Sequence, residues 1–246
     1  MKTENEGKAF NEVYSLSLWT ELLRVVEFPR TSSQFDSQSD WRNHYRAFQF
    51  EHVLRPRERG SLVVEQNKSK GILKLISTAT AELSRAAYNS HTSADCIDRE
   101  LIMPVSWTTD RGHNPEIPWT GTRIEGRIKD GGMTLKNDGG VSAWDLRDQD
   151  WSSFDTLIAS VQKLDRGADM EFCLIDEWCQ LKPNQRVRCA GEHRIRFDGF
   201  SLALDQFVLS GEATLPVVFW TDRRGRVLYF VSGMEVYVLD SKKSSP

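Results

Sequence analysis

The sequence predicts a mostly β protein: a curved antiparallel sheet, of half-barrel, clam or sandwich type, with one central amphipathic helix near 152–164. Two observations support this fold class. Short runs of alternating apolar and polar residues recur, with turn residues between them, and a helical period of apolar residues stands out once. We expect an N-terminal segment with a candidate short helix (1–40), a single antiparallel β domain (41–240) and a frayed tail (241–246).

The composition is that of an ordinary globular protein. Of 246 residues, 39% are hydrophobic and 27% are charged, with 32 basic against 35 acidic side chains. These values argue against a disordered, collagen-like or small disulfide-rich chain. The balance of charge gives no sign of a nucleic-acid partner. The apolar runs are strand-sized, so no transmembrane segment is expected.

The spacing of apolar residues and the positions of turn-forming residues predict the helices, strands and loops before the central helix. Residues 14–26 have apolar side chains at helical spacing, which predicts a short helix, and the polar stretch 31–40 predicts a loop. The proline- and glycine-containing stretch Trp107–Gly121 predicts a surface loop. The expected strands are Arg46–Leu54, Ser61–Glu65, Ile72–Thr78, Thr80–Tyr88, Asp98–Ser106, Thr122–Lys129 and Met133–Lys136, with turns at 67–71 and 130–132.

The central helix has the clearest pattern in the chain. Ser152 is a candidate N-cap with Asp155 three residues later, and Gly167 follows the last turn. Its apolar stripe consists of Leu157, Ile158, Val161 and Leu164. A meander of five strands is expected after it, at about 170–180, 186–197, 200–209, 213–221 and 226–239.

The helix and the meander together resemble a known architecture at the level of pattern. The order helix, then meander, ending in Val217–Trp220 and Val227–Leu239, resembles half-barrel or clam proteins that include the periplasmic lipoprotein carriers. The resemblance covers the chain from the helix onward and includes no signature motif. It implies a strongly curved antiparallel sheet that wraps a helix or an apolar ligand.

The hairpin 170–197 supplies one candidate active site. A loop from Lys182 to Arg186 would place Cys179 opposite Cys189, as a disulfide or as two reduced thiols. The same register sets Asp176 opposite Glu192, where two carboxylates in a partly desolvated site would share a proton and act as general acid and base. The side chains expected to support substrate there are Arg188, Arg194 and Trp178. The alternative is an exposed β face on which charges alternate.

The stretch Trp107–Thr120 supplies the second candidate site. Trp107 and Trp119 offer flat apolar faces, while Asp110 and His113 offer hydrogen bonding and proton transfer, a combination that suits a sugar-binding or sugar-cleaving cleft. His113 is the candidate catalytic histidine. The alternative is an ordered connection whose tryptophans cover the end of the sheet.

Three functions stay open on these residues. The first is binding, with or without cleavage by a hydrolase or lyase, of a saccharide-like ligand, acidic if the arginines take part. The second is a non-catalytic β-clam carrier of an apolar or amphipathic ligand, and the third is an intracellular interaction module. No P-loop, dinucleotide fingerprint or zinc spacing occurs, so neither cofactor nor metal is expected. A homo-oligomer is left open, as is the compartment: cytoplasmic for a complete chain, periplasmic or secreted if a signal peptide was removed.

Overall fold

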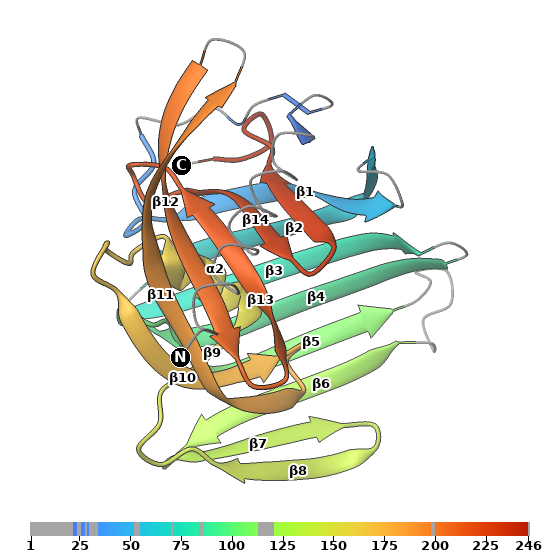
Figure 1. Ribbon diagram of the computed structural model, residues 1–246. Coiled ribbons are helices and arrows are strands. Elements are labelled where there is room, and N and C mark those ends of the chain that lie inside the picture. Colours follow the sequence, from blue (N-terminus) through green and yellow to red (C-terminus); the bar gives the residue numbers. More distant parts are fainter. Residues whose placement is uncertain are drawn as a thin grey trace, which may run out of the picture.

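The described residues form one open, antiparallel-dominated sheet and one short helix (Figure 1). The computed structural model describes residues 22–23, 26–27, 29, 34–51, 55–69, 71–83, 86–112, 121–197 and 200–245. The sheet has 15 strands in the order β8-β7-β6-β5-β4-β3-β2-β1-β15-β14-β13-β12-β11-β10-β9. The predicted fold class, mostly β with a single short helix, is confirmed.

The sheet divides into two arms. The N-terminal arm consists of β1 (Trp41–Glu51), β2 (Arg55–Ser69), β3 (Ile72–Leu83), β4 (Ala86–Ile97), β5 (Met103–Gly112), β6 (Thr122–Lys129), β7 (Gly132–Asn137) and β8 (Gly140–Asp145). The C-terminal arm consists of β9 (Trp151–Ser153), β10 (Asp169–Asp176), β11 (Gln180–Phe197), β12 (Phe200–Gly211), β13 (Thr214–Thr221), β14 (Val227–Ser232) and β15 (Glu235–Leu239). The helix α2 (Phe154–Val161) follows β9. The arms join where β1 pairs with β15.

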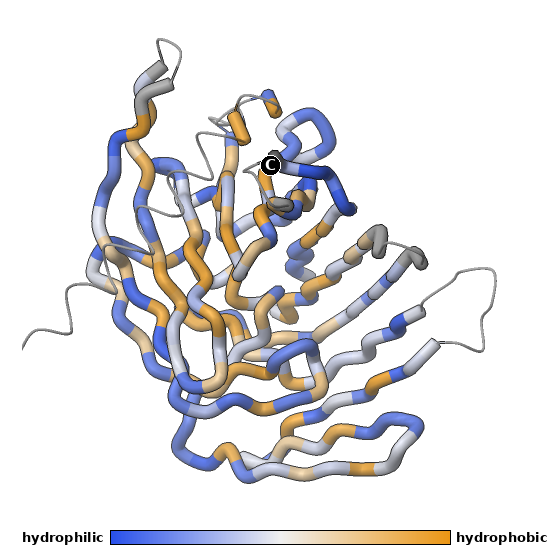
Figure 2. The backbone as a smooth tube through the Cα atoms, turned by 45° about the vertical axis from the view of Figure 1, so that its right-hand side comes forward, coloured by the Kyte–Doolittle hydropathy of each residue, from blue (hydrophilic) through white to orange (hydrophobic). Residues whose placement is uncertain are grey.

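The two arms face each other with α2 between them (Figure 1). At the far side from the β1–β15 junction, β9 approaches the start of β5. Ser152 Oγ donates to the carbonyl of Ile102 at 3.1 Å, and Trp151 Nε1 donates to that of Pro104 at 2.7 Å. Hydrophobic positions gather in the space between the arms (Figure 2). The molecule therefore has the shape of a clam whose interior holds the helix.

Burial along the strands follows two patterns: in some strands alternate residues are buried, and in others successive residues are buried. In β3, Leu73 and Leu75 are buried while Lys74 and Thr80 are exposed, because one face of this strand meets solvent. In β14, all residues from Val227 to Val231 are buried, because both faces of that strand are covered.

Helix α2 is shorter than the predicted 152–164 and has a different cap. Ser152 lies in β9, and the N-cap is Ser153, whose side chain accepts from the backbone N–H of Thr156 while Thr156 Oγ1 accepts from the N–H of Ser153. This reciprocal pair satisfies two backbone donors that the helix start leaves free. The predicted apolar stripe is confirmed as buried. Among the described residues, no helix approaches the length and apolarity that crossing a bilayer requires.

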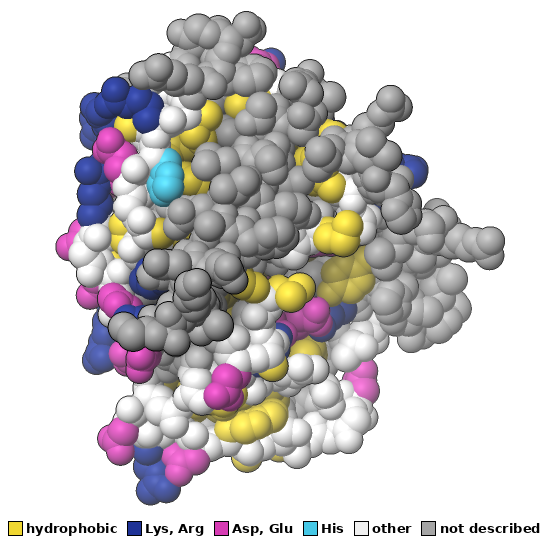
Figure 3. Space-filling model, viewed as in Figure 1, with side chains coloured by type: hydrophobic (Ala, Val, Ile, Leu, Met, Phe, Trp, Pro, Cys, Tyr) yellow, Lys and Arg dark blue, Asp and Glu magenta, His cyan; other side chains and the backbone are white. Residues whose placement is uncertain are grey.

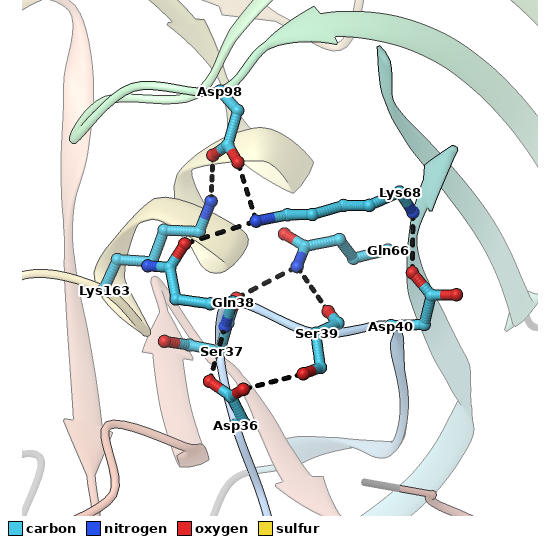
Figure 4. Close-up of polar contacts among 9 residues, drawn as sticks. All are labelled: Asp36, Ser37, Gln38, Ser39, Asp40, Gln66, Lys68, Asp98 and Lys163. Carbon is cyan, nitrogen blue, oxygen red and sulfur yellow. Dashed lines mark hydrogen bonds and ion pairs between the residues drawn. The ribbon is translucent and has the colours of Figure 1, made fainter. Parts of the chain in front are cut away.

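A polar cluster fixes the C-terminal end of α2 (Figure 4). Lys163, only 4% exposed, forms an ion pair with Asp98, and Asp98 also binds Lys68 at 2.7 Å. Burial lowers the pKa of Lys163, and its bond to Asp98 acts in the opposite direction. The segment 36–40 closes over this cluster: Gln38 Oε1 accepts from Lys68 Nζ at 3.2 Å. The helix is thus tied to β2 and to the chain that precedes β1.

Several predicted boundaries in the N-terminal arm are wrong. The hairpin between β3 and β4 interrupts the predicted strand Thr80–Tyr88, and β5 begins only at Met103, so Asp98–Ser106 is a strand in its last part alone. The predicted loop Trp107–Gly121 is β5 as far as Gly112, with Trp107 3% exposed. The hairpins at 67–71 and 130–132 are confirmed.

The two ends of the chain were predicted to be a short helix and a frayed tail, and neither prediction is confirmed. Most of the predicted helix 14–26 lies outside the described residues; within it, Val26 N donates to the carbonyl of Leu22 at 3.0 Å. The tail 241–246 was expected as a frayed end. Instead, Ser245 exchanges two backbone hydrogen bonds with Arg42, at 2.9 and 3.3 Å, and its carbonyl accepts from buried Arg226. The predicted strand 226–239 is two strands, β14 and β15, which turn at Gly233.

Candidate functional site

The β10–β11 hairpin turns at residues 177–179, so the predicted loop Lys182–Arg186 is wrong. Asp176 lies opposite Gln180, and Cys179 N donates to the carbonyl of Asp176 at 3.0 Å. The turn is made by Glu177 and Trp178, which have φ angles of 46° and 61°. Positive φ is rare for side chains of this size, so composition does not predict a turn here.

This register separates the residues of the first candidate site. Cys189 lies opposite Phe207 instead of Cys179, and all four cysteines are free. Asp176 forms an ion pair with Lys182 at 2.7 Å. Glu192 lies opposite Asp205, far along β11, where Arg166 binds it at 2.5 Å. The predicted pair of catalytic carboxylates therefore does not form.

The other predicted ligand-binding residues divide between the outer surface and the undescribed part of the chain. Arg188 lies opposite Val208, and Arg194 is exposed opposite Ala203. Asp110 is exposed on β5 and pairs with Arg123 at 3.5 Å. His113 and Trp119 lie outside the described residues, so their roles stay predictions. On the face in Figure 3, side chains of both charges alternate along the left and lower border, without a patch of one sign.

A cavity of about 870 Å³ lies between the two arms. Its walls come from β1 to β7 on one side, and from the start of α2, the 177–179 turn and the β14–β15 hairpin on the other. Its apolar lining consists of Ala47, Phe48, Leu62, Ala79, Ala81, Tyr88, Ile124, Phe154, Ile175, Trp178 and Tyr237. Its charged lining consists of Arg59, Arg111, Asp155, Asp176, Glu177 and Glu235.

Two predicted tryptophans meet at this cavity. Trp107 Nε1 donates to the carbonyl of Trp178 at 3.3 Å, and the two rings lie 5.6 Å apart between centroids. The indole of Trp107 also lies across Gly126 on β6, where an added Cβ would be 1.9 Å from the ring. Glycine at this position therefore makes room for the ring that supports Trp178.

Asp155, in the first turn of α2, is the most distinctive polar group of the wall. Its Oδ2 accepts from Ser77 Oγ at 2.6 Å and from Trp178 Nε1 at 2.8 Å. Its Oδ1 accepts no hydrogen bond from a described residue. Burial raises the pKa of this carboxyl, while the two hydrogen bonds and the charge of Arg111 act in the opposite direction. Within the described part of the chain, one carboxylate oxygen is thus left available to a ligand.

Arg111 forms another part of the wall. Its side chain is 18% exposed and binds Glu177 twice, through Nη1 to the carboxylate at 3.3 Å and through Nη2 to the backbone carbonyl. Its Nε is buried and has no hydrogen-bond partner in the described structure. The ion pair fixes the strained turn against β5 and neutralises the arginine.

Aromatic rings continue the wall toward the β14–β15 hairpin. Tyr237 stacks on Phe230 with ring centroids 4.4 Å apart, and Phe154 contacts the same Phe230 at 5.7 Å. Tyr237 donates its hydroxyl hydrogen to Glu235 at 2.7 Å. Burial first, and Glu235 second, raise the pKa of Tyr237, so this hydroxyl stays protonated and is a donor already in use.

The sequence did not identify Asp155 or Tyr237 as site residues, and it placed Arg111 only within the second candidate stretch, Trp107–Thr120. Asp155 lies in the first turn of the helix, where an acidic residue is common, so its sequence position predicts only a helix start. Arg111 lies in a stretch that was predicted to be a loop. Only the pairing of strands far apart in the chain brings these residues together. Three residues that the sequence did single out are found at the cavity: Trp178 and Asp176 line it, and Trp107 contacts Trp178.

No group of three His, Cys, Asp or Glu side chains in the described ranges is arranged to hold a metal ion. No protein-family model matches this chain, and no curated protein shows significant sequence similarity to it.

Proposed function

We propose that the protein binds a small amphipathic ligand in the cavity between its arms and acts as a non-catalytic carrier. The observation that carries this proposal is the cavity itself, which has a volume of about 870 Å³ and a mixed lining of aromatic and aliphatic side chains, uncharged polar side chains and six charged groups. Sites for small organic molecules have this size and this mixture. The resemblance of the helix and meander to clam-shaped carriers supports the same function.

The turn that closes the β10–β11 hairpin places a tryptophan at the cavity. Trp178 and Glu177 both have positive φ, a strained conformation that costs about 1–3 kcal/mol per residue. The strain directs the Trp178 indole against Asp155 at the cavity. Strained backbone of this kind concentrates at ligand sites, where the surrounding structure holds a side chain in place.

The magnitudes explain why both apolar and polar groups are needed. A ligand that buries about 200 Å² of apolar surface gains roughly 5 kcal/mol from the hydrophobic effect. Association costs at least about 4 kcal/mol in lost translational and rotational freedom. Apolar contact alone therefore gives weak binding, and the polar groups of the wall must supply the rest.

Cleavage of a saccharide has less support. Glycoside hydrolysis needs two carboxyl groups placed about 5 to 9.5 Å apart across the scissile bond. The pair predicted for that role, Asp176 and Glu192, lies at two distant places on the C-terminal arm, and each carboxylate is held by a cation.

The test is binding of Nile red, a neutral dye whose emission rises in apolar surroundings. We expect the protein to bind it saturably, and Ala79→Trp, which fills part of the cavity from β3, to weaken binding. Thr78→Trp is the matched control, because Thr78 lies on the opposite face of the same strand and contacts His91 there. A protein that does not bind the dye, or equal weakening by both variants, would contradict the proposal.

A further inference from the structure

The charged groups of the cavity are not balanced. Four carboxylates and two guanidinium groups line it. Most of these charges have partners: Arg111 is paired with Glu177, Asp176 with Lys182, and Glu235 accepts from Tyr237. Among the described residues, no lysine or arginine lies within the 4.0 Å of an ion pair with Asp155.

The hydrogen bonds to Asp155 from described residues leave its second carboxylate oxygen, Oδ1, without a donor. Its two donors among the described residues, Ser77 and Trp178, bind the same oxygen, Oδ2. A carboxylate can accept several hydrogen bonds, and a buried one without a counter-ion is costly. A donor that also carries positive charge would use Oδ1 and offset the burial of the negative charge.

The side chains around Asp155 suit the same kind of group. The rings of Phe154, Trp178 and Tyr237 line the cavity with it. Aromatic faces attract cations through the ring quadrupole, and the attraction is stronger where water is excluded. Of the two arginines that line the cavity, Arg111 already has a carboxylate partner, so an acidic ligand bound at Arg111 would have to displace Glu177.

We infer that the ligand of this cavity is an amphipathic amine, whose protonated nitrogen binds Asp155 and whose apolar body lies along the aromatic wall. This inference rests on the proposed function, because it names the class of ligand for the same cavity. It differs from the expectation of an acidic ligand, which was based on Arg188 and Arg194; these arginines lie elsewhere on β11.

The test compares decylamine, decanol and decanoate, below their aggregation concentrations, as competitors of bound Nile red at pH 7, where the amine is protonated. These probes share one tail and differ in head group. We expect decylamine to compete about tenfold more strongly than decanol, with decanoate the weakest, since a charge-assisted hydrogen bond in such a site is worth about that factor. Equal competition by the three, or preference for decanoate, overturns the inference.

Two variants locate the effect. Asp155→Asn keeps acceptors for Ser77 and Trp178 and should abolish the preference for decylamine while Nile red still binds. Asp110→Asn removes the same charge from the outer face of β5 and should leave the preference intact. Loss of preference in both variants would overturn a direct contact with Asp155. Failure of the wild-type protein to bind Nile red would instead contradict the proposed function, so the two failures are distinguishable.

Discussion

The two ends of helix α2 have opposite characters. At the C-terminal end, Lys163 is buried and paired with Asp98, which Lys68 also binds, and the segment 36–40 covers the cluster (Figure 4). At the N-terminal end, Asp155 is held by two neutral donors and borders a cavity. The comparison teaches that one element serves two purposes: its C-terminal end is tied to the N-terminal arm, and its N-terminal end presents a carboxyl group that has no ion-pair partner among the described residues.

The largest expected effect is that of Gly126→Ala, which disturbs the cavity wall near the N-terminal end of α2. The added Cβ would lie 1.9 Å from the Trp107 ring, which must move out of its buried position. We expect a loss of about 3 kcal/mol in the free energy of unfolding, comparable to a lost large core side chain, measured by urea titration. Nile red binding should weaken as well, because Trp107 supports Trp178.

Gly112→Ala is the control, since a Cβ there meets no atom of the described residues within 4 Å. Its unfolding free energy should stay within about 0.5 kcal/mol of the wild-type value. If Gly126→Ala were equally mild, the close packing of Trp107 on β6 would be disproved.

A smaller effect is expected at the C-terminal end of α2, with Asp98→Asn. This change leaves Lys163 buried without its carboxylate, and Asp98 itself is partly exposed, so we expect a loss of about 2 kcal/mol by urea titration. Dye binding should not change, because the cluster is not part of the cavity wall.

The control for that change is Asp145→Asn on β8, whose bond to Arg147 is exposed on both sides. An exposed pair contributes little, so its loss should leave the free energy of unfolding almost unchanged. Equal effects of the two variants would show that the Lys163 cluster does not anchor the helix.

The smallest effect is a pH dependence at Asp155. Burial raises the pKa of this carboxyl in the folded protein, so the folded state binds the proton more tightly than the unfolded state. Stability relative to Asp155→Asn should therefore increase as pH falls from 7, through the folded pKa, toward the ordinary aspartate value near 3.8. Buried Asp222, whose pKa is also raised, titrates in both proteins and cancels. A difference in stability that stays constant or falls with decreasing pH would contradict the burial of Asp155.

The sequence predicted the elements whose period is local. The stripe from Leu157 to Leu164 requires only a helix against a core, and the hairpin at 130–132 has glycine where the chain reverses. Thus the fold class and the buried face of α2 could be predicted from residues alone.

The β10–β11 register could not be predicted, because its turn lacks turn chemistry. Lys182, Pro183 and Asn184 look like a turn but lie within β11, near an irregularity in its pairing with β10. The real turn uses Glu177 and Trp178 at positive φ, which only the surrounding tertiary contacts, such as Arg111 on Glu177, make stable. Moving the turn from 182–186 to 177–179 changes the cross-strand partner of each β11 residue in the predicted site, so Glu192 no longer lies opposite Asp176.

The most direct test of the account is two-dimensional NMR of the indole N–H groups during titration with decylamine, with the Trp178 signal assigned from its absence in Trp178→Phe. We predict a saturable shift of the Trp178 signal, because its N–H binds the carboxylate that receives the amine, while the signal of core residue Trp220 stays in place. An unchanged Trp178 signal at saturating decylamine, or an equal shift of Trp220, would contradict ligand binding between the arms.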